Sequence, residues 1–180
     1  MLIVLSGLPG TGKTTISKAL VAKRSAAYVR VDEIEHALRQ HAGFDQEIGA
    51  AGYLVAFAIA SSNLKLGNLV IADCVNPVPD SRQGWRDMVR AIEGASLIEV
   101  EIICSDENEH RRRVEGRAPD ISGFTLPTWS SVTSHDYVPW TEPRLIVDTA
   151  NLSVPDAVLM IERQLEVMAE DRPSSPKADS

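Results

Sequence analysis

The chain has 180 residues, of which 44% are hydrophobic and 24% charged, and these values are ordinary for one soluble globular domain. They exclude a disordered chain, a collagen-like fibre and a disulfide scaffold. The 18 basic and 25 acidic residues give a net charge of −7, whereas a duplex-binding protein normally presents a broad basic surface. We therefore expect no extended nucleic acid as a partner.

The composition also argues against a membrane protein. No apolar run reaches the roughly 20 residues that span a bilayer. The apolar residues 1–5 follow no basic region and lead directly into a glycine-rich loop, which argues against a signal peptide. The two cysteines, Cys74 and Cys104, lie in apolar, strand-like segments without the spacing of metal ligands. We interpret them as reduced core residues of a cytoplasmic protein.

Short apolar runs alternate along the chain with segments of helical periodicity. Strands that alternate with helices predict an α/β fold with a parallel sheet and helices on both of its faces. Sheets of this kind bind their ligands beyond the carboxyl ends of the strands. In chain order, strands are expected at 2–5, 28–31, 69–72, 97–104 and 145–147, and helices at 13–24, 46–66, 80–93, from about 106 and from about 153.

The segment 118–143 is longer than an ordinary connection and contains four prolines and several aromatic residues. We interpret 106–143 as a lid that excludes water and covers a second substrate. The polar residues 171–180 are expected to form a disordered tail. The sequence thus predicts a single domain over residues 1–170. The apolar helix at 49–60 is compatible with either a monomer or a homodimer.

Directly after the first predicted strand, the sequence matches G-x-x-x-x-G-K-[ST] in full. Its glycines allow several backbone N–H groups to face one point, which also faces the positive end of the following helix dipole. The lysine would reach the β- and γ-phosphates of a nucleotide, and the first threonine would bind Mg²⁺. The nucleotide-binding residues expected here are Gly7, Leu8, Pro9, Gly10, Thr11, Gly12, Lys13, Thr14 and Thr15.

Two aspartates follow predicted strands and would lie beside this loop. Asp73 is placed to hold Mg²⁺, although a helix cap or turn residue is an alternative. Asp32 is placed to accept the proton of an attacking hydroxyl, and an N-cap role is compatible with this. Glu33 and Glu35 are nearby alternatives to Asp32.

Arginines are a recurrent need in phosphoryl transfer, because the protein contributes mostly positioning and charge neutralisation. Arg113 and Arg117 are four residues apart and would share one helical face, although nearby glutamates leave open a merely solvated helix. Arg39 and Arg82 follow the second and third strands and could bind an acceptor, but a surface salt bridge explains either of them equally well.

Together these residues resemble the small-molecule kinases of the nucleoside-monophosphate-kinase-like branch of the P-loop superfamily. That branch includes shikimate, gluconate, chloramphenicol and adenylylsulfate kinases, AAA-type kinases and the kinase domains of polynucleotide kinases. The resemblance rests on GLPGTGKTT at 7–15, Asp32, VIADCVNP at 70–77 and RVEGR at 113–117. It implies a three-layer P-loop NTPase fold with a five-stranded parallel sheet in the order 2-3-1-4-5 and a lid segment.

The resemblance also implies roles for residues. The carboxylate that ends the second strand in these kinases binds or deprotonates the acceptor hydroxyl, and it corresponds to Asp32. Arg113 would pack on adenine, Arg117 would contact phosphate, and residues 149–151 would line the adenine pocket. Arg39 lies farther from Asp32 than the matching arginine of polynucleotide kinases does, and with the acidic charge this argues against a polynucleotide acceptor.

We therefore expect an enzyme that uses ATP and Mg²⁺ to phosphorylate a hydroxyl group of a small molecule. Its catalytic residues would be Lys13, Asp32, Arg113 and Arg117, its metal ligands Thr14 and Asp73, and its acceptor-binding residues Asp32, Arg39 and Arg82. One alternative is a P-loop NTPase that acts as a nucleotide-dependent switch or partner-binding module. Another is a toxin-like kinase or a kinase of nucleic acid ends.

Overall fold

The computed structural model describes residues 1–41 and 48–170 and contains a five-stranded sheet in the order β2-β3-β1-β4-β5. All four strand pairings are parallel, so the predicted fold class and strand order are confirmed. The strands are β1 (Leu2–Ser6), β2 (Ala27–Arg30), β3 (Val70–Asp73), β4 (Leu97–Ile103) and β5 (Leu145–Asp148).

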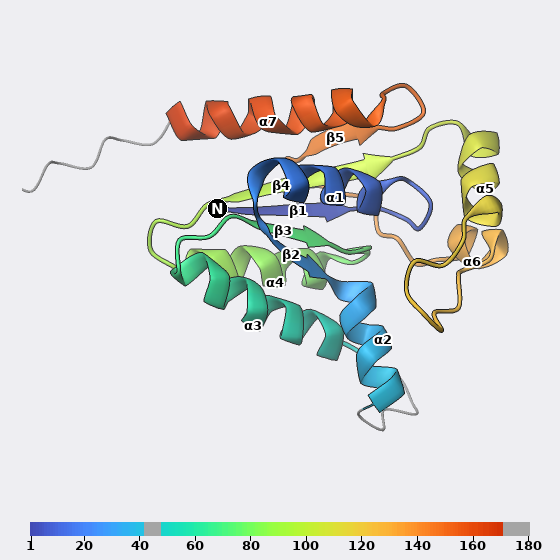
Figure 1. Cartoon of the computed structure of the whole chain (residues 1–180), viewed down its shortest axis with the longest axis horizontal. Helices are drawn as coiled ribbons and strands as arrows, with labels where there is room; N and C mark the ends of the chain where they lie inside the picture. Colours follow the sequence, from blue (N-terminus) through green and yellow to red (C-terminus); the bar gives the residue numbers. More distant parts are fainter. Residues whose placement is uncertain (42–47, 171–180) are drawn as a thin grey trace, which may run out of the picture.

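Helices cover both faces of this sheet, and further helices stand beyond the ends of the strands (Figure 1). Helix α1 (Lys13–Arg24) begins and ends where the sequence predicts it, whereas α3 (Ala51–Lys65) begins only after Gly49, which adopts a φ of +54°. Residues 46 and 47 of that predicted helix lie outside the described residues. The helices are α1 (Lys13–Arg24), α2 (Val31–His41), α3 (Ala51–Lys65), α4 (Pro79–Arg90), α5 (Glu107–Gly116), α6 (Trp129–Thr133) and α7 (Val154–Glu170).

The sheet separates two hydrophobic cores, and the alternation of side chains along β1 shows why. Ile3 and Leu5 pack toward α1 and α7, whereas Leu2 and Val4 pack toward α3 and α4. All four are fully buried, as expected for the central strand of a parallel sheet.

None of the helices in the described part of the chain is long and apolar enough to cross a membrane. Among these residues both cysteines are free, and Cys74 is buried whereas Cys104 is only half-buried.

The segment that we interpreted as a lid lies beyond the carboxyl ends of the strands, where α5 and α6 flank a loop (Figure 1). Its last part, at 137–140, is attached to the start of α4 by Arg82, which is fully buried on that helix. The guanidinium donates to the carbonyls of Asn76, Pro77 and Val138 at 2.5–3.1 Å and lies 4.2 Å from the centre of the Trp140 ring.

Because a substitution would leave the carbonyl of the buried Asn76 without its donor and remove a fully buried side chain from beside the Trp140 ring, Arg82→Ala should lower the free energy of unfolding by about 3 kcal/mol or more. Arg90→Ala on the same helix is the control, because the Arg90 side chain is 70% exposed and its loss should cost about 0.5 kcal/mol or less. Urea unfolding of both variants measures the difference. Equal, small losses would show that Arg82 does not hold the 137–140 segment.

Candidate functional site

The loop between β1 and α1 is shaped by glycines with positive φ. Gly7 has a φ of +142°, and a Cβ there would lie 2.2 Å from the carbonyl oxygen of Ile102. Gly10 has a φ of +86°, and a Cβ would lie 2.5 Å from a methyl group of Val114 on α5. A side chain fits at neither position, so the loop approaches β4 and α5 as closely as its glycines allow. The backbone between them ends at the N-terminus of α1, where an anion is favoured.

Lys13 is the first residue of α1 and is buried at the centre of the site. Its ammonium donates to the carbonyl of Leu8 at 2.9 Å, within the same loop. Burial lowers the pKa of Lys13, while the carboxylates of Asp73 and Asp32 act in the opposite direction. A buried cation with two carboxylates nearby is suited to bind the phosphate groups of a nucleotide.

The predicted metal residues, Thr14 and Asp73, lie together. The Thr14 hydroxyl donates to Asp73 Oδ2 at 2.7 Å, and the Tyr28 hydroxyl donates to the same oxygen at 2.9 Å. Hard oxygen donors of this kind fit Mg²⁺, which in nucleotide enzymes takes few ligands from the protein. The described residues contain no group of three or more His, Cys, Asp or Glu side chains that could hold a metal ion.

Asp32 lies in the first turn of α2 and not at the end of a strand, because β2 ends at Arg30. Its side chain nevertheless lines the main cavity of the molecule. Burial raises the pKa of Asp32, and the nearby Asp73 carboxylate adds to this, whereas Lys13 and Arg30 lower it. The carboxylate is therefore costly to keep ionised, and it is a better proton acceptor than an exposed aspartate would be.

The main cavity has a volume of about 970 Å³ and extends from the phosphate loop to the lid. It is lined by Lys13, Thr14 and Asp32 from the body of the domain and by Arg113 and Arg117 from α5 and its C-terminal end. The structure thus brings together all four residues that the sequence indicated as catalytic.

Arg113 also lines a smaller hollow of about 290 Å³ on the other side of the loop, together with Gly12, Thr149 and Leu152. Its guanidinium donates to the Thr149 hydroxyl at 2.8 Å and to the Thr149 carbonyl at 3.0 Å. The Thr149 hydroxyl in turn donates to the carbonyl of Thr11 in the phosphate loop at 2.8 Å. The segment after β5 therefore joins the loop to α5, next to a hollow with an apolar wall.

Two predicted acceptor residues lie outside the cavity. Arg82 is fully buried against backbone carbonyls and aromatic rings, so the role predicted for it is wrong. Arg39 lies on the exposed part of α2, where it pairs with Glu35 at 3.3 Å, one helical turn away. That pair is the surface salt bridge that the sequence left open as the alternative.

The sequence did not indicate that three other residues belong to this site. Arg30 is 3% exposed at the end of β2 and pairs with Asp120 of the lid. His110 is buried, and its Nε2 donates to the carbonyl of Pro9 at 2.8 Å. A charged residue inside an otherwise apolar strand was the signal for Arg30. Asp120 and His110 had none, because their partners are far away in the sequence.

The fold and the phosphate loop define a P-loop nucleotide-binding domain. The chain belongs to the AAA domain family, whose model matches residues 2–130. It is 27% identical over 159 residues to a protein named probable adenylyl-sulfate kinase in Aeropyrum pernix, with 86% of both chains covered. It is 26% identical over 157 residues to an adenylyl-sulfate kinase of Bacillus pumilus, covering 84% of this chain and 78% of the relative.

Among solved structures, a gluconokinase from Sinorhizobium meliloti has a TM-score of 0.64 at 19% identity, covering 95% of this chain and 97% of the other. An APS kinase from Mycobacterium tuberculosis, solved with AMPPNP and APS, also has a TM-score of 0.64, at 20% identity and with 92% and 96% covered. At these identities the two structures show the shared fold alone. Together with the family model and the adenylyl-sulfate kinase relatives, this confirms the resemblance to P-loop small-molecule kinases.

The raised pKa of Asp32 predicts how this carboxyl affects stability. The folded protein holds the Asp32 proton more tightly than the unfolded chain does. The free energy of unfolding therefore decreases as the pH rises from the pKa of Asp32 in the unfolded chain to its pKa in the folded protein, and it stays lower above that. Asp32→Asn should therefore be more stable than the wild type at pH 7, and the difference should narrow as the pH falls toward 4. Urea midpoints at both values measure this. A variant that is less stable at pH 7 would contradict the account.

Proposed function

We propose that the protein is an ATP- and Mg²⁺-dependent phosphotransferase that moves the γ-phosphate of ATP to a hydroxyl group of a small molecule. The observation that carries the proposal is the common cavity, which the phosphate loop, Asp32 and the lid arginines line together, with Asp73 hydrogen-bonded to Thr14 beside it. The names of its relatives support a kinase, since these include an adenylyl-sulfate kinase and a gluconokinase.

In this proposal the nucleotide lies across the phosphate loop. The backbone N–H groups of the loop and Lys13 bind the phosphates, and the hollow beside Thr149 and Leu152 receives the adenine base. Thr14 and Asp73 would hold Mg²⁺, which when bound neutralises phosphate charge and fixes its geometry. Arg113 would lie between base and phosphates, because it lines both hollows.

The acceptor lies on the lid side of the cavity, next to Asp32. The Asp32 carboxylate accepts a hydrogen bond from the acceptor hydroxyl, orients its oxygen toward the γ-phosphorus and takes its proton as the new bond forms. The bond from that phosphorus to the bridging oxygen breaks, and ADP leaves. Lys13 and Arg117 neutralise the negative charge that spreads over the transferring group. Closure of the lid over the cavity would keep water from replacing the acceptor.

The first test measures ADP release from Mg-ATP with a panel of hydroxyl compounds that includes sugars, sugar acids, nucleosides and adenylyl sulfate. One compound should accelerate release, and Asp32→Asn should retain ATP binding while losing about 100-fold or more of the stimulated rate. Glu33→Gln is the matched control and should keep the rate, because the Glu33 side chain is 51% exposed. If both variants turned over the acceptor like the wild type, Asp32 would have no role in transfer.

A second test concerns the metal residues. Thr14→Ala should weaken binding of Mg-ATP about tenfold, whereas binding of ATP in excess EDTA should stay unchanged, because the hydroxyl matters only to the metal. Thr14→Ser keeps the hydroxyl and should restore Mg-ATP binding. Calorimetric titration of the three proteins gives the dissociation constants. An equal loss with and without Mg²⁺ would assign Thr14 to phosphate binding.

A further inference from the structure

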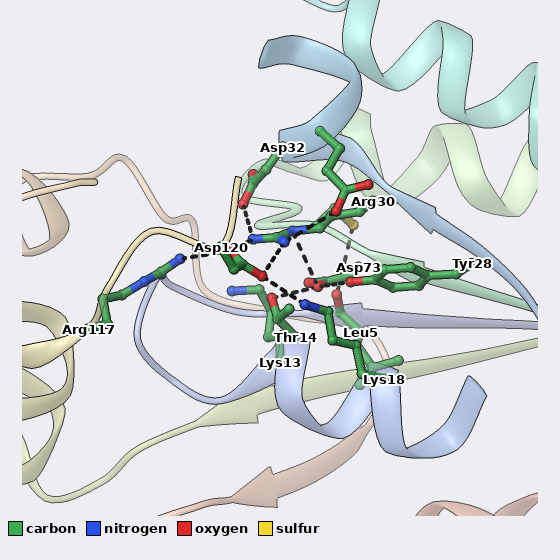
Figure 2. Close-up of polar contacts among 12 residues, drawn as sticks. Leu5, Lys13, Thr14, Lys18, Tyr28, Arg30, Asp32, Asp73, Arg117 and Asp120 are labelled. Carbon is green, nitrogen blue, oxygen red and sulfur yellow. Dashed lines mark hydrogen bonds and ion pairs between the residues drawn. The ribbon is translucent and has the colours of Figure 1, made fainter. Parts of the chain in front are cut away.

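Arg30 is a buried cation whose contacts belong to two parts of the molecule. Its side chain is 1% exposed at the end of β2. Its two terminal nitrogens donate to the two carboxylate oxygens of Asp120 at 2.8 and 3.1 Å. Such paired bonds fix both the distance and the orientation of the partner. Since Asp120 belongs to the lid segment, the lid is attached to the end of the sheet by this ion pair (Figure 2).

Asp120 has two further cationic neighbours. Lys18 on α1 donates to Asp120 Oδ2 at 2.8 Å, and Arg117 lies 3.9 Å from Oδ1. The hydrogen bonds from Arg30, assisted by Lys18, hold the pKa of Asp120 well below its usual range. Figure 2 shows the Asp120 carboxylate between these side chains, which come from the sheet, α1 and the lid itself. One lid carboxylate therefore contacts three separate parts of the site.

Arg30 also lies near Asp32 and Asp73, the two carboxylates that the proposed function assigns to the acceptor and to Mg²⁺. Its guanidinium lies 3.9 Å from Asp32 Oδ2 and 3.9 Å from Asp73 Oδ2, and 3.4 Å from Glu33 at the exposed edge. The Nε of Arg30 is buried without a hydrogen bond in the described part of the chain, so the bonds to Asp120 supply much of what orients this side chain. If Asp120 moved away, Arg30 would be free to turn among the remaining carboxylates.

We propose that Asp120 and Arg30 form a latch that holds the lid closed and sets the position of Arg30 between Asp32 and Asp73. Lid closure and the arrangement of the two carboxylates are then coupled through one positioning residue. The latch itself stands on the contacts alone, whereas its effect on phosphoryl transfer rests on the proposed function. The strength of the latch is electrostatic, so it weakens as salt screens the partly exposed Asp120.

The first experiment tests the latch without any substrate. Hydrogen exchange of the amides at 117–126 is compared in the wild type, Asp120→Asn and Glu115→Gln. Asp120→Asn should accelerate exchange about tenfold, because a charge-assisted bidentate contact is lost. Glu115→Gln removes the same charge from the same segment, but Glu115 pairs with Arg111 on the exposed face of α5. It should exchange like the wild type.

Salt and a second variant complete this test. Raising the salt concentration should accelerate exchange in the wild type but not in Asp120→Asn, which has already lost the contact. Arg30→Lys keeps the buried charge without the two parallel bonds and should loosen the lid to an intermediate degree. Unchanged exchange in Asp120→Asn and Arg30→Lys would overturn the latch, whether or not the protein proves to be a kinase.

The second experiment tests the coupling with Mg-ATP and the acceptor that stimulates turnover. Asp120→Asn should lower kcat and raise the KM for the acceptor, while the affinity for ATP alone stays unchanged. If the lid were looser but kcat and the KM for the acceptor were unchanged, the latch would stand but its coupling to the reaction would be overturned. A looser lid in a protein whose ATP turnover responds to no acceptor would instead count against the proposed function.

Discussion

The site depends on the balance of charge at the carboxyl end of the sheet. Lys13, Arg30 and Asp73 are all buried there, and burial of any one alone would be costly. They are stable as a set, because Thr14 and Tyr28 donate to Asp73 while Arg30 is paired with Asp120. The strand order places β3 and β2 next to each other, so the parallel register itself aligns Arg30 with Asp73.

This balance explains why the lid is part of the site and not a separate cover. The lid contributes Arg113 and Arg117 to the lining of the cavity. It also contributes Asp120, which is the partner of Arg30. At its other end, Arg82 attaches the 137–140 segment to the base of α4. The lid is thus held at both ends by arginines that lie on the body of the domain, and the cavity between these attachments stays large enough for a nucleotide and a small acceptor.

The sequence predicted the parts of the site that depend on local pattern. The phosphate loop, Asp73 and Arg113 were found because a fixed motif, a strand end or a helical spacing marks each of them. Arg117 reaches the cavity although it does not share a helical face with Arg113, because α5 ends at Gly116. Arg82 was misplaced, because position after a strand does not determine whether a side chain turns outward or into the core. Arg39 forms the surface ion pair that the sequence had left open as an alternative. Arg30–Asp120 and His110–Pro9 could not be predicted, since each joins residues about a hundred positions apart.

The central claim is that the γ-phosphate of ATP passes to a hydroxyl held beside Asp32 and not to water. Mass spectrometry of candidate acceptors, incubated with the protein and Mg-ATP, tests this claim most directly. The account predicts one compound that becomes heavier by a single phosphoryl group, in an amount equal to the ADP formed. ADP formed together with an equal amount of inorganic phosphate, in the presence of every compound and with none of them phosphorylated, would contradict it.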